Sequence, residues 1–184
     1  MALLAEELVE EWLNRQGYFT IRGIKLGVQE IDLLAVKPKD GKVECRHIEV
    51  QAAMRPVSYI SRVPVAAQKQ GRAANSAKRT KEELIEGVSE WVEKKFRHPK
   101  KLALQESLWP GHWSPELVIN NVKSDEEVDL IKGHGINVIR LQYVISELAT
   151  TGQYSACGAD FVDLIHMGSH AQQAHPVDAK KRRD

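Results

Sequence analysis

Cysteine is scarce in this chain of 184 residues, because only Cys45 and Cys157 occur. Two cysteines cannot build the disulfide framework of a small secreted domain, so we expect two reduced thiols. The sequence also lacks any apolar stretch close to the ~18 residues that indicate a membrane span. Its acidic start has no basic segment followed by an apolar run, so nothing indicates a signal peptide. These absences predict a soluble, cytoplasmic protein.

A strong net charge is also lacking, because the formal charge is only +1. The charges are nevertheless unevenly distributed, which matters more for binding than their sum. Segment 62–81 contains basic residues and no acid, and its basic residues are Arg62, Lys69, Arg72, Lys78, Arg79 and Lys81. The members between positions 69 and 79 are candidates for binding nucleic-acid phosphates. The alternative for this run is a solvated face of a helix.

Several familiar chemical motifs are missing. We find no glycine-rich phosphate loop, no plausible Ser-His-Asp arrangement and no internal repeat. His166, His170 and His175 have loosely metal-like spacing, but no Cys-x₂-Cys pair accompanies them. We therefore interpret these histidines as incidental.

The length and a 42% hydrophobic content suit one compact α/β domain, predicted over residues 1–170 with a polar, basic tail at 171–184. Helices on both faces of a mixed sheet are the expected architecture. The expected elements, in chain order, are helix 3–16, strands 18–25, 28–37 and 42–51, loop 52–63, helix 64–96, an irregular stretch 98–115, strand 116–122, helix 124–132, strand 136–144 and helix 159–167. Pro64 marks the first helical position of the long helix, which Gly71 and Gly87 could interrupt.

Asp40-Gly41 separates the second and third strands and is a strong signal for a two-residue hairpin turn. In that register, paired positions have numbers that sum to 81, so Asp32 and Glu49 lie directly opposite each other. Their Cβ atoms would be about 4.5–5.5 Å apart on one face. Two like charges at that distance require a shared proton or a cation between them, and a hard divalent metal fits. The alternative is a solvated surface pair.

Strand alternation places further polar side chains on this face. His47, Glu49 and Gln51 share it, whereas Ile48 and Val50 point to the opposite face, which we expect to be buried. The sequence therefore predicts that polar groups converge at one end of the hairpin.

The segment Gly27-Val28-Gln29-Glu30-Ile31-Asp32-Leu33-Leu34-Ala35-Val36, followed by His47-Ile48-Glu49-Val50-Gln51, resembles the PD-(D/E)XK, or restriction-endonuclease-like, nuclease superfamily. Members carry an acidic residue on the second strand and (D/E)-x-K on the third, in an αβββαβ core. Glu6 precedes Gly17-Tyr18 much as a helix glutamate does in bacterial members. The resemblance implies a Mg²⁺- or Mn²⁺-dependent endonuclease acting on DNA. Asp32, Glu49 and a backbone oxygen of Val50 or Ile48 would bind the metal, and Glu6 could face the site or remain solvated.

One position departs from the family pattern, because Gln51 replaces the family lysine. Glutamine can orient the attacking water but cannot supply positive charge. Some restriction endonucleases of this superfamily carry Glu-x-Gln, and Lys25 or Lys69 could supply the missing charge. We expect a nuclease that could act as a homodimer. The alternatives are a catalytically decayed module that binds nucleic acid or a protein partner, and an unrelated α/β scaffold.

Overall fold

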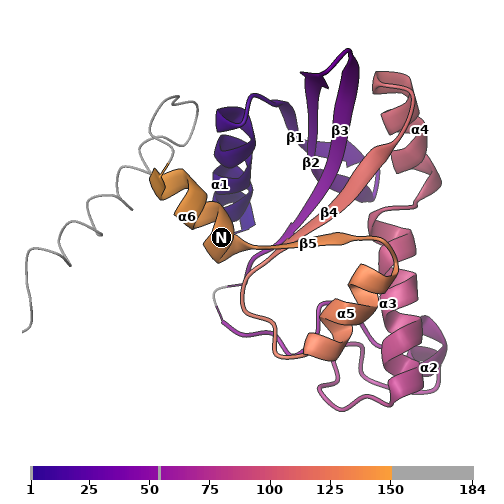
Figure 1. The fold of residues 1–184 in the computed structure, drawn as a ribbon. Helices are drawn as coiled ribbons and strands as arrows, with labels where there is room; N and C mark the ends of the chain where they lie inside the picture. The colour runs from indigo at the N-terminus through magenta and orange to yellow at the C-terminus, as the bar shows by residue number, and fades with distance from the viewer. Residues whose placement is uncertain (1, 54, 151–184) are drawn as a thin grey trace, which may run out of the picture.

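The computed structural model describes residues 2–53 and 55–150, which form a five-stranded mixed sheet in the order β1-β2-β3-β4-β5 (Figure 1). The strands are β1 (Phe19–Leu26), β2 (Gln29–Lys39), β3 (Lys42–Gln51), β4 (Trp113–Ile119) and β5 (Asn137–Arg140). The first three strands are antiparallel, and β4 and β5 continue the sheet in parallel to β3. The helices are α1 (Ala2–Arg15), α2 (Val65–Lys69), α3 (Lys81–Lys95), α4 (Pro99–Leu108), α5 (Asp125–Gly133) and α6 (Leu141–Thr150).

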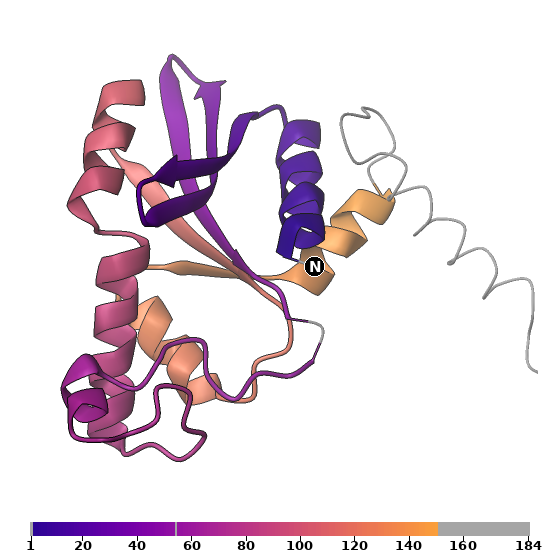
Figure 2. The same ribbon diagram turned by 180° about the vertical axis from the view of Figure 1, so that it is seen from behind.

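Helices cover both faces of the sheet (Figures 1 and 2). On one face, α1 and α6 pack on Ile48, Val50 and Val118. On the other face, α3 and α5 pack on Leu117 and Ile119. Burial of these apolar faces is the main force that holds the layers together. The predicted α/β class with a mixed sheet is confirmed, and the order α1-β1-β2-β3 fits an αβββ core.

The β2–β3 hairpin turns at Asp40 and Gly41, whose φ angles are 50° and 74°. Two successive positive φ angles define a type I′ turn, which matches the twist of the flanking strands. Lys39 pairs with Lys42 and Leu33 pairs with Ile48, so paired positions sum to 81 throughout the ladder. The predicted hairpin register is therefore confirmed.

The long helix expected over 64–96 is divided into two helices, and the break contains Gly71, one of the two interruptions that the sequence allowed. Helix α2 follows Pro64 and already ends at Lys69. Gly71, two residues later, has a φ of 92°, which a helix cannot contain. Helix α3 starts only at Lys81, because Thr80 and Glu83 form a reciprocal capping box that fixes its first turn. The sequence contains the pattern of this capping box, Thr80-Lys81-Glu82-Glu83. The predicted interruption at Gly87 does not occur, since this glycine lies inside α3.

Two further segments differ from expectation. Helix α4 occupies part of the stretch predicted to be irregular, and it begins with His98 as N-cap and proline at the first turn. The strand predicted over 136–144 stops at Arg140, because Leu141, Val144 and Leu148 have helical spacing and pack in the same core cluster as α1. The helix starting near Ser124 is confirmed.

Some predictions fall on residues 151–184, which lie outside the described part. They concern helix 159–167, the tail 171–184, Cys157 and the three late histidines, and the 1–170 domain boundary also stays a prediction. Among the described residues, no helix has the length and apolar character needed to cross a membrane.

Gly87 explains how the loop before α2 approaches α3 closely. A Cβ at position 87 would lie 2.4 Å from the Arg62 carbonyl oxygen, which is backbone and cannot move aside easily. We expect Gly87→Ala to lower the free energy of unfolding by about 1–3 kcal/mol, despite the better helix propensity of alanine. Urea denaturation would measure this. Gly133→Ala is the matched control, because a Cβ there meets nothing within 4 Å, and equal effects of both substitutions would contradict the explanation.

Candidate active site

Asp32 lies where the β2–β3 ladder ends. The last ladder pair is Leu33 with Ile48, so Asp32 and Glu49 occupy the next two facing positions. The Val50 backbone N–H donates a hydrogen bond of 2.7 Å to Asp32 Oδ2. This bond holds the Asp32 carboxylate against β3, one residue beyond Glu49.

Glu49 is fully buried, and three side chains donate to its carboxylate. Lys95 Nζ from the end of α3 lies 2.5 Å from Oε2, and Lys101 Nζ from α4 lies 2.6 Å from Oε1. His47 Nε2 lies 3.1 Å from Oε1. Burial alone would raise the pKa of Glu49, but the His47 hydrogen bond and the two ammonium groups outweigh it and hold the pKa at about 2. Glu49 is therefore ionised at any working pH.

Asp32 is perturbed in the opposite direction. Burial, followed by repulsion from ionised Glu49, raises the pKa of Asp32 to about 7, although Lys95 and the Val50 N–H act against this rise. The charge of Glu6 raises the pKa of Asp32 further. Burial and the neighbouring Glu49 and Glu6 thus disfavour the charged form of Asp32, and a bound cation would relieve this cost.

Buried polar side chains hold the Glu49 carboxylate in place through hydrogen bonds. The Gln105 side-chain amide donates to His47 Nδ1 at 2.8 Å, so the imidazole proton is on Nε2 and is donated to Glu49. Burial lowers the pKa of His47, which keeps the ring neutral. Lys101 is only 1% exposed and also donates to the Lys95 carbonyl oxygen at 2.8 Å. These contacts fix the orientation of Glu49.

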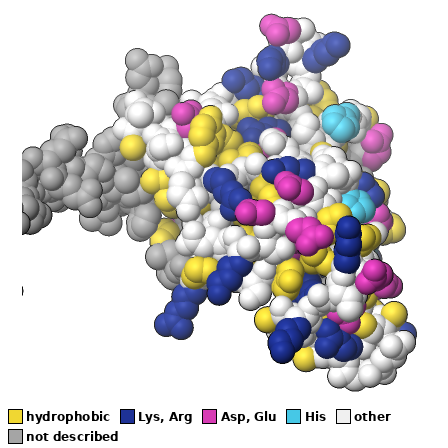
Figure 3. Space-filling view, turned by 60° about the horizontal axis from the view of Figure 1, so that its bottom comes forward, with side chains coloured by type: hydrophobic (Ala, Val, Ile, Leu, Met, Phe, Trp, Pro, Cys, Tyr) yellow, Lys and Arg dark blue, Asp and Glu magenta, His cyan; other side chains and the backbone are white. Residues whose placement is uncertain are grey.

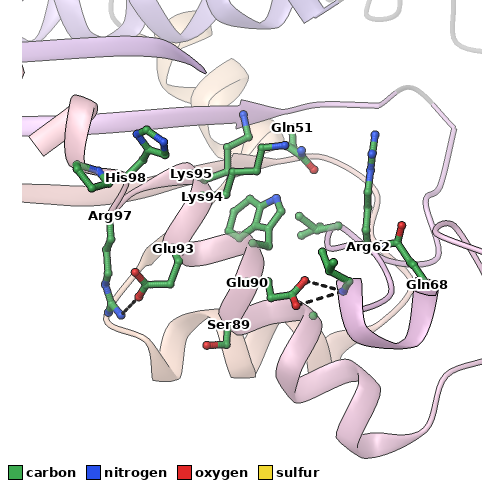
Figure 4. Close-up of a pocket in the computed structure, with 15 residues that line it drawn as sticks. Gln51, Arg62, Gln68, Ser89, Glu90, Glu93, Lys94, Lys95, Arg97 and His98 are labelled. Atoms are coloured by element: carbon green, nitrogen blue, oxygen red, sulfur yellow. Dashed lines mark hydrogen bonds and ion pairs between the residues drawn. The ribbon is translucent and has the colours of Figure 1, made fainter. Parts of the chain in front are cut away.

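Glu6 and Gln51 border the two carboxylates. Glu6 is half-buried on α1, and its pKa is raised by burial, then by the charge of Glu30, with a smaller contribution from Glu49. The charge of Glu6 therefore acts on Asp32 and Glu49, and its role in the site stays a prediction. Gln51 is half-buried at the end of β3 and lines a pocket beside Lys95 (Figure 4).

The predicted alternation of β3 is confirmed. Ile48 and Val50 join the core cluster that contains α1, whereas His47 packs on Phe96 and Glu49 faces Lys95 and Lys101.

The sequence did not identify Lys95 and Lys101 as site residues. Of the lysines suggested instead, Lys25 is exposed on β1 and Lys69 is exposed at the end of α2. In the described part of the chain, the ammonium groups on Glu49 are those of Lys95 and Lys101. No local pattern marks Lys101. No local pattern marks Lys95 either, because the capping box at Thr80 fixes the start of α3 and not its end.

The basic run is not a continuous track on one helix. Arg72 pairs with Glu83 and donates to the Lys78 carbonyl oxygen. Arg79 stacks over the Tyr59 ring at 4.2 Å and donates to Ser61. Both arginines therefore hold the loop between α2 and α3, whereas Lys69 and Lys78 are exposed. Figure 3 shows Lys and Arg interspersed with Asp and Glu on the face that it presents.

Asp32 and Glu49 are the carboxylates that could bind a metal at this site. Among the described residues, no group of three or more His, Cys, Asp or Glu side chains is placed to hold an ion. This argues against a closed site of the structural zinc type. Mg²⁺ is commonly held by one or two carboxylates together with water and substrate phosphates. Asp32 and Glu49 supply two carboxylates of the kind that such an open site uses, and in this structure both oxygens of Glu49 contact lysine ammonium groups.

Comparisons with known proteins add little. No protein-family model and no curated protein matches the chain. One solved structure, the crystal structure of a protein of unknown function called AF1548, is similar with a TM-score of 0.43 and 17% sequence identity. The match covers 78% of this chain and 60% of that chain, which is less than two thirds of its length. It supplies no function for the protein described here.

Proposed function

We propose that this protein is a metal-dependent nuclease that hydrolyses phosphodiester bonds, with DNA as its substrate and a PD-(D/E)XK-like site. The observation that carries the proposal is the facing pair Asp32 and Glu49 at the end of the β2–β3 ladder, with a lysine beside it. The pKa of about 2 at Glu49 and about 7 at Asp32 supports it, because strongly separated carboxylate pKa values are typical of catalytic sites.

Asp32 and Glu49 would hold the divalent cation, together with the Val50 carbonyl oxygen. A cation bound there supplies Lewis-acid stabilisation of phosphate charge and lowers the pKa of a water. Gln51 would orient that water by hydrogen bonding. Lys101 is too deeply buried to reach substrate, so its role is to orient Glu49.

Lys95 would supply the positive charge that Gln51 lacks. Its side chain is 26% exposed, and it lines the pocket next to Gln51 while contacting Glu49. Lys95 is therefore the residue of the site that would stabilise negative charge on a phosphate oxygen of the substrate.

The direct test is cleavage of supercoiled plasmid and single-stranded DNA with Mg²⁺ or Mn²⁺, with EDTA as the blank. We expect Lys95→Met to reduce the cleavage rate by about 100-fold and to leave Mn²⁺ affinity equal or higher, because a competing cation is removed. Calorimetry would measure the affinity. Lys25→Met is the matched control, since Lys25 is exposed on β1. An unchanged cleavage rate in Lys95→Met would show that Lys95 does not stabilise the phosphate charge.

A second candidate function is a decayed nuclease module that binds nucleic acid or a partner without cutting. The contacts that favour it are those of Glu49, whose two oxygens already receive lysine ammonium groups. No calorimetric signal for Mn²⁺, combined with DNA binding that persists, would support this function. The variant Gln51→Lys separates the two: gained cleavage indicates decay, whereas lost cleavage indicates that Gln51 is adapted to the reaction.

A further inference from the structure

A pocket of about 800 Å³ opens beside the candidate active site, between α3 and the segment that leads into α2. Gln51 and Lys95 line it, so the pocket adjoins the two carboxylates. Its lining contains four strongly basic side chains, namely Arg62, Lys94, Lys95 and Arg97, and two acidic ones, namely Glu90 and Glu93. Basic side chains therefore outnumber acidic ones in the pocket.

Both acidic side chains of the pocket already have partners. Glu90 accepts the Val65 backbone N–H with both oxygens, at 3.0 and 3.1 Å, which satisfies a donor at the start of α2. Glu93 pairs with Arg97 at 2.9 Å. Of the remaining basic groups, Lys95 contacts Glu49.

The side chains of Arg62 and Lys94 are exposed and make no hydrogen bond or ion pair with the described residues. In Figure 4 the side chains of Arg62 and Lys94 rise from the two sides of the pocket toward the end where Gln51 lies. Two unpaired cations on either side of a cavity are a suitable arrangement for an anion with more than one charged group.

The backbone that carries Arg62 is held firmly. Glu127, fully buried, accepts the N–H groups of Ile60 and Ser61 at 2.6 and 2.8 Å. Arg79 donates to the Ser61 carbonyl oxygen at 2.8 Å from the other side. The Arg62 carbonyl oxygen rests against Gly87 of α3. The backbone of Arg62 is therefore fixed at the pocket rim, so binding a ligand there would not require this segment to be ordered.

We propose that this pocket binds backbone phosphates of the nucleic-acid strand being cut, through Arg62 and Lys94, next to the bond that is cleaved at Asp32 and Glu49. The proposal rests on the proposed nuclease function. A pocket of this volume is in the range that takes small ligands, so it fits one or two nucleotides of one strand. Trp91 is only 8% exposed, which leaves phosphate contact rather than base stacking as the mode of recognition.

The test is fluorescence anisotropy of a labelled dT₁₂ oligonucleotide in EDTA, where no cleavage occurs. We expect Arg62→Gln/Lys94→Gln to weaken binding about tenfold and to reduce the slope of log K against log salt by about 1.4, which is two phosphate contacts on a single strand. The charge-matched control is Lys42→Gln/Lys123→Gln, because both lysines are exposed elsewhere. Thermal melts check that all variants fold.

Equal weakening in the control pair, or an unchanged salt slope, would overturn the proposal. A second measurement is competition with inorganic phosphate. If millimolar phosphate displaces the oligonucleotide completely, the pocket is a site for an isolated anion rather than for a strand. Cleavage in Mg²⁺ is scored separately. If the wild-type protein binds dT₁₂ through Arg62 and Lys94 but does not cut it in Mg²⁺, the nuclease function is rejected and the pocket proposal stands. If the wild-type protein cuts DNA but the double variant binds dT₁₂ as tightly as the wild type, the pocket proposal is rejected and the nuclease function stands.

Discussion

Asp32→Asn is expected to abolish metal-dependent cleavage while making the metal-free protein more stable above neutral pH. Asparagine can still accept the Val50 N–H, so the local structure is kept. It cannot supply the negative charge needed for a divalent cation, and we expect the cleavage rate to fall by at least about 1,000-fold. The same change removes a buried charge that is repelled by Glu49.

The pH dependence follows from the raised pKa of Asp32. The folded protein holds this proton up to about pH 7, whereas the unfolded chain loses it near the ordinary value of 3.8. Stability therefore falls as the pH rises through this window, and the full cost is present above pH 7. Asparagine does not titrate, so the gain from Asp32→Asn should be near zero at pH 4 and on the order of 1–3 kcal/mol at pH 8, allowing for partial solvent screening.

Urea denaturation in EDTA at pH 4, 6 and 8 measures this gain. Asp129→Asn serves as the control, because the Asp129 side chain is 74% exposed. A gain that does not grow with pH would contradict the raised pKa of Asp32. Cleavage at the wild-type rate by Asp32→Asn would remove Asp32 from the proposed reaction.

The sequence predicted the positions of the site residues on the β2–β3 hairpin, because the residues of the turn and the strands determine them locally. A two-residue Asp-Gly turn sets the register, and the register with strand alternation decides which side chains face each other. Asp32, Glu49 and Gln51 could therefore be placed without knowledge of the remaining chain.

The two lysines of the site, Lys95 and Lys101, could not be predicted, because their positions depend on how distant elements pack. Lys95 and Lys101 reach Glu49 only after α3 and α4 are placed against β3, 46 and 52 residues later in the chain. His98-Pro99 favoured an irregular interpretation, although proline at a first helical turn equally starts α4. The partners of Arg72 and Arg79 are likewise tertiary, so their basic character alone was misleading.

Glu49→Gln is expected to destabilise the protein more than any other single change at the site, because it leaves the buried ammonium group of Lys101 without a counter-charge. Removing one partner of a buried ion pair costs about 3–5 kcal/mol. Lys101→Met should cost less, about 1–3 kcal/mol, since Glu49 keeps its contacts with Lys95 and His47.

The double variant Glu49→Gln/Lys101→Met measures how much of these two stability losses comes from the contact between Glu49 and Lys101. It removes both buried charges, so its cost should be smaller than the two single costs together by about 2 kcal/mol or more. The exposed pair Asp129 and Lys132 provides the comparison cycle, for which we expect at most about 0.5 kcal/mol of coupling. Coupling at that low level between Glu49 and Lys101 would mean that Lys101 does not hold the carboxylate in place. A folded double variant that does not cleave, beside a Lys101→Met variant that does, would show that the carboxylate is needed for the reaction itself.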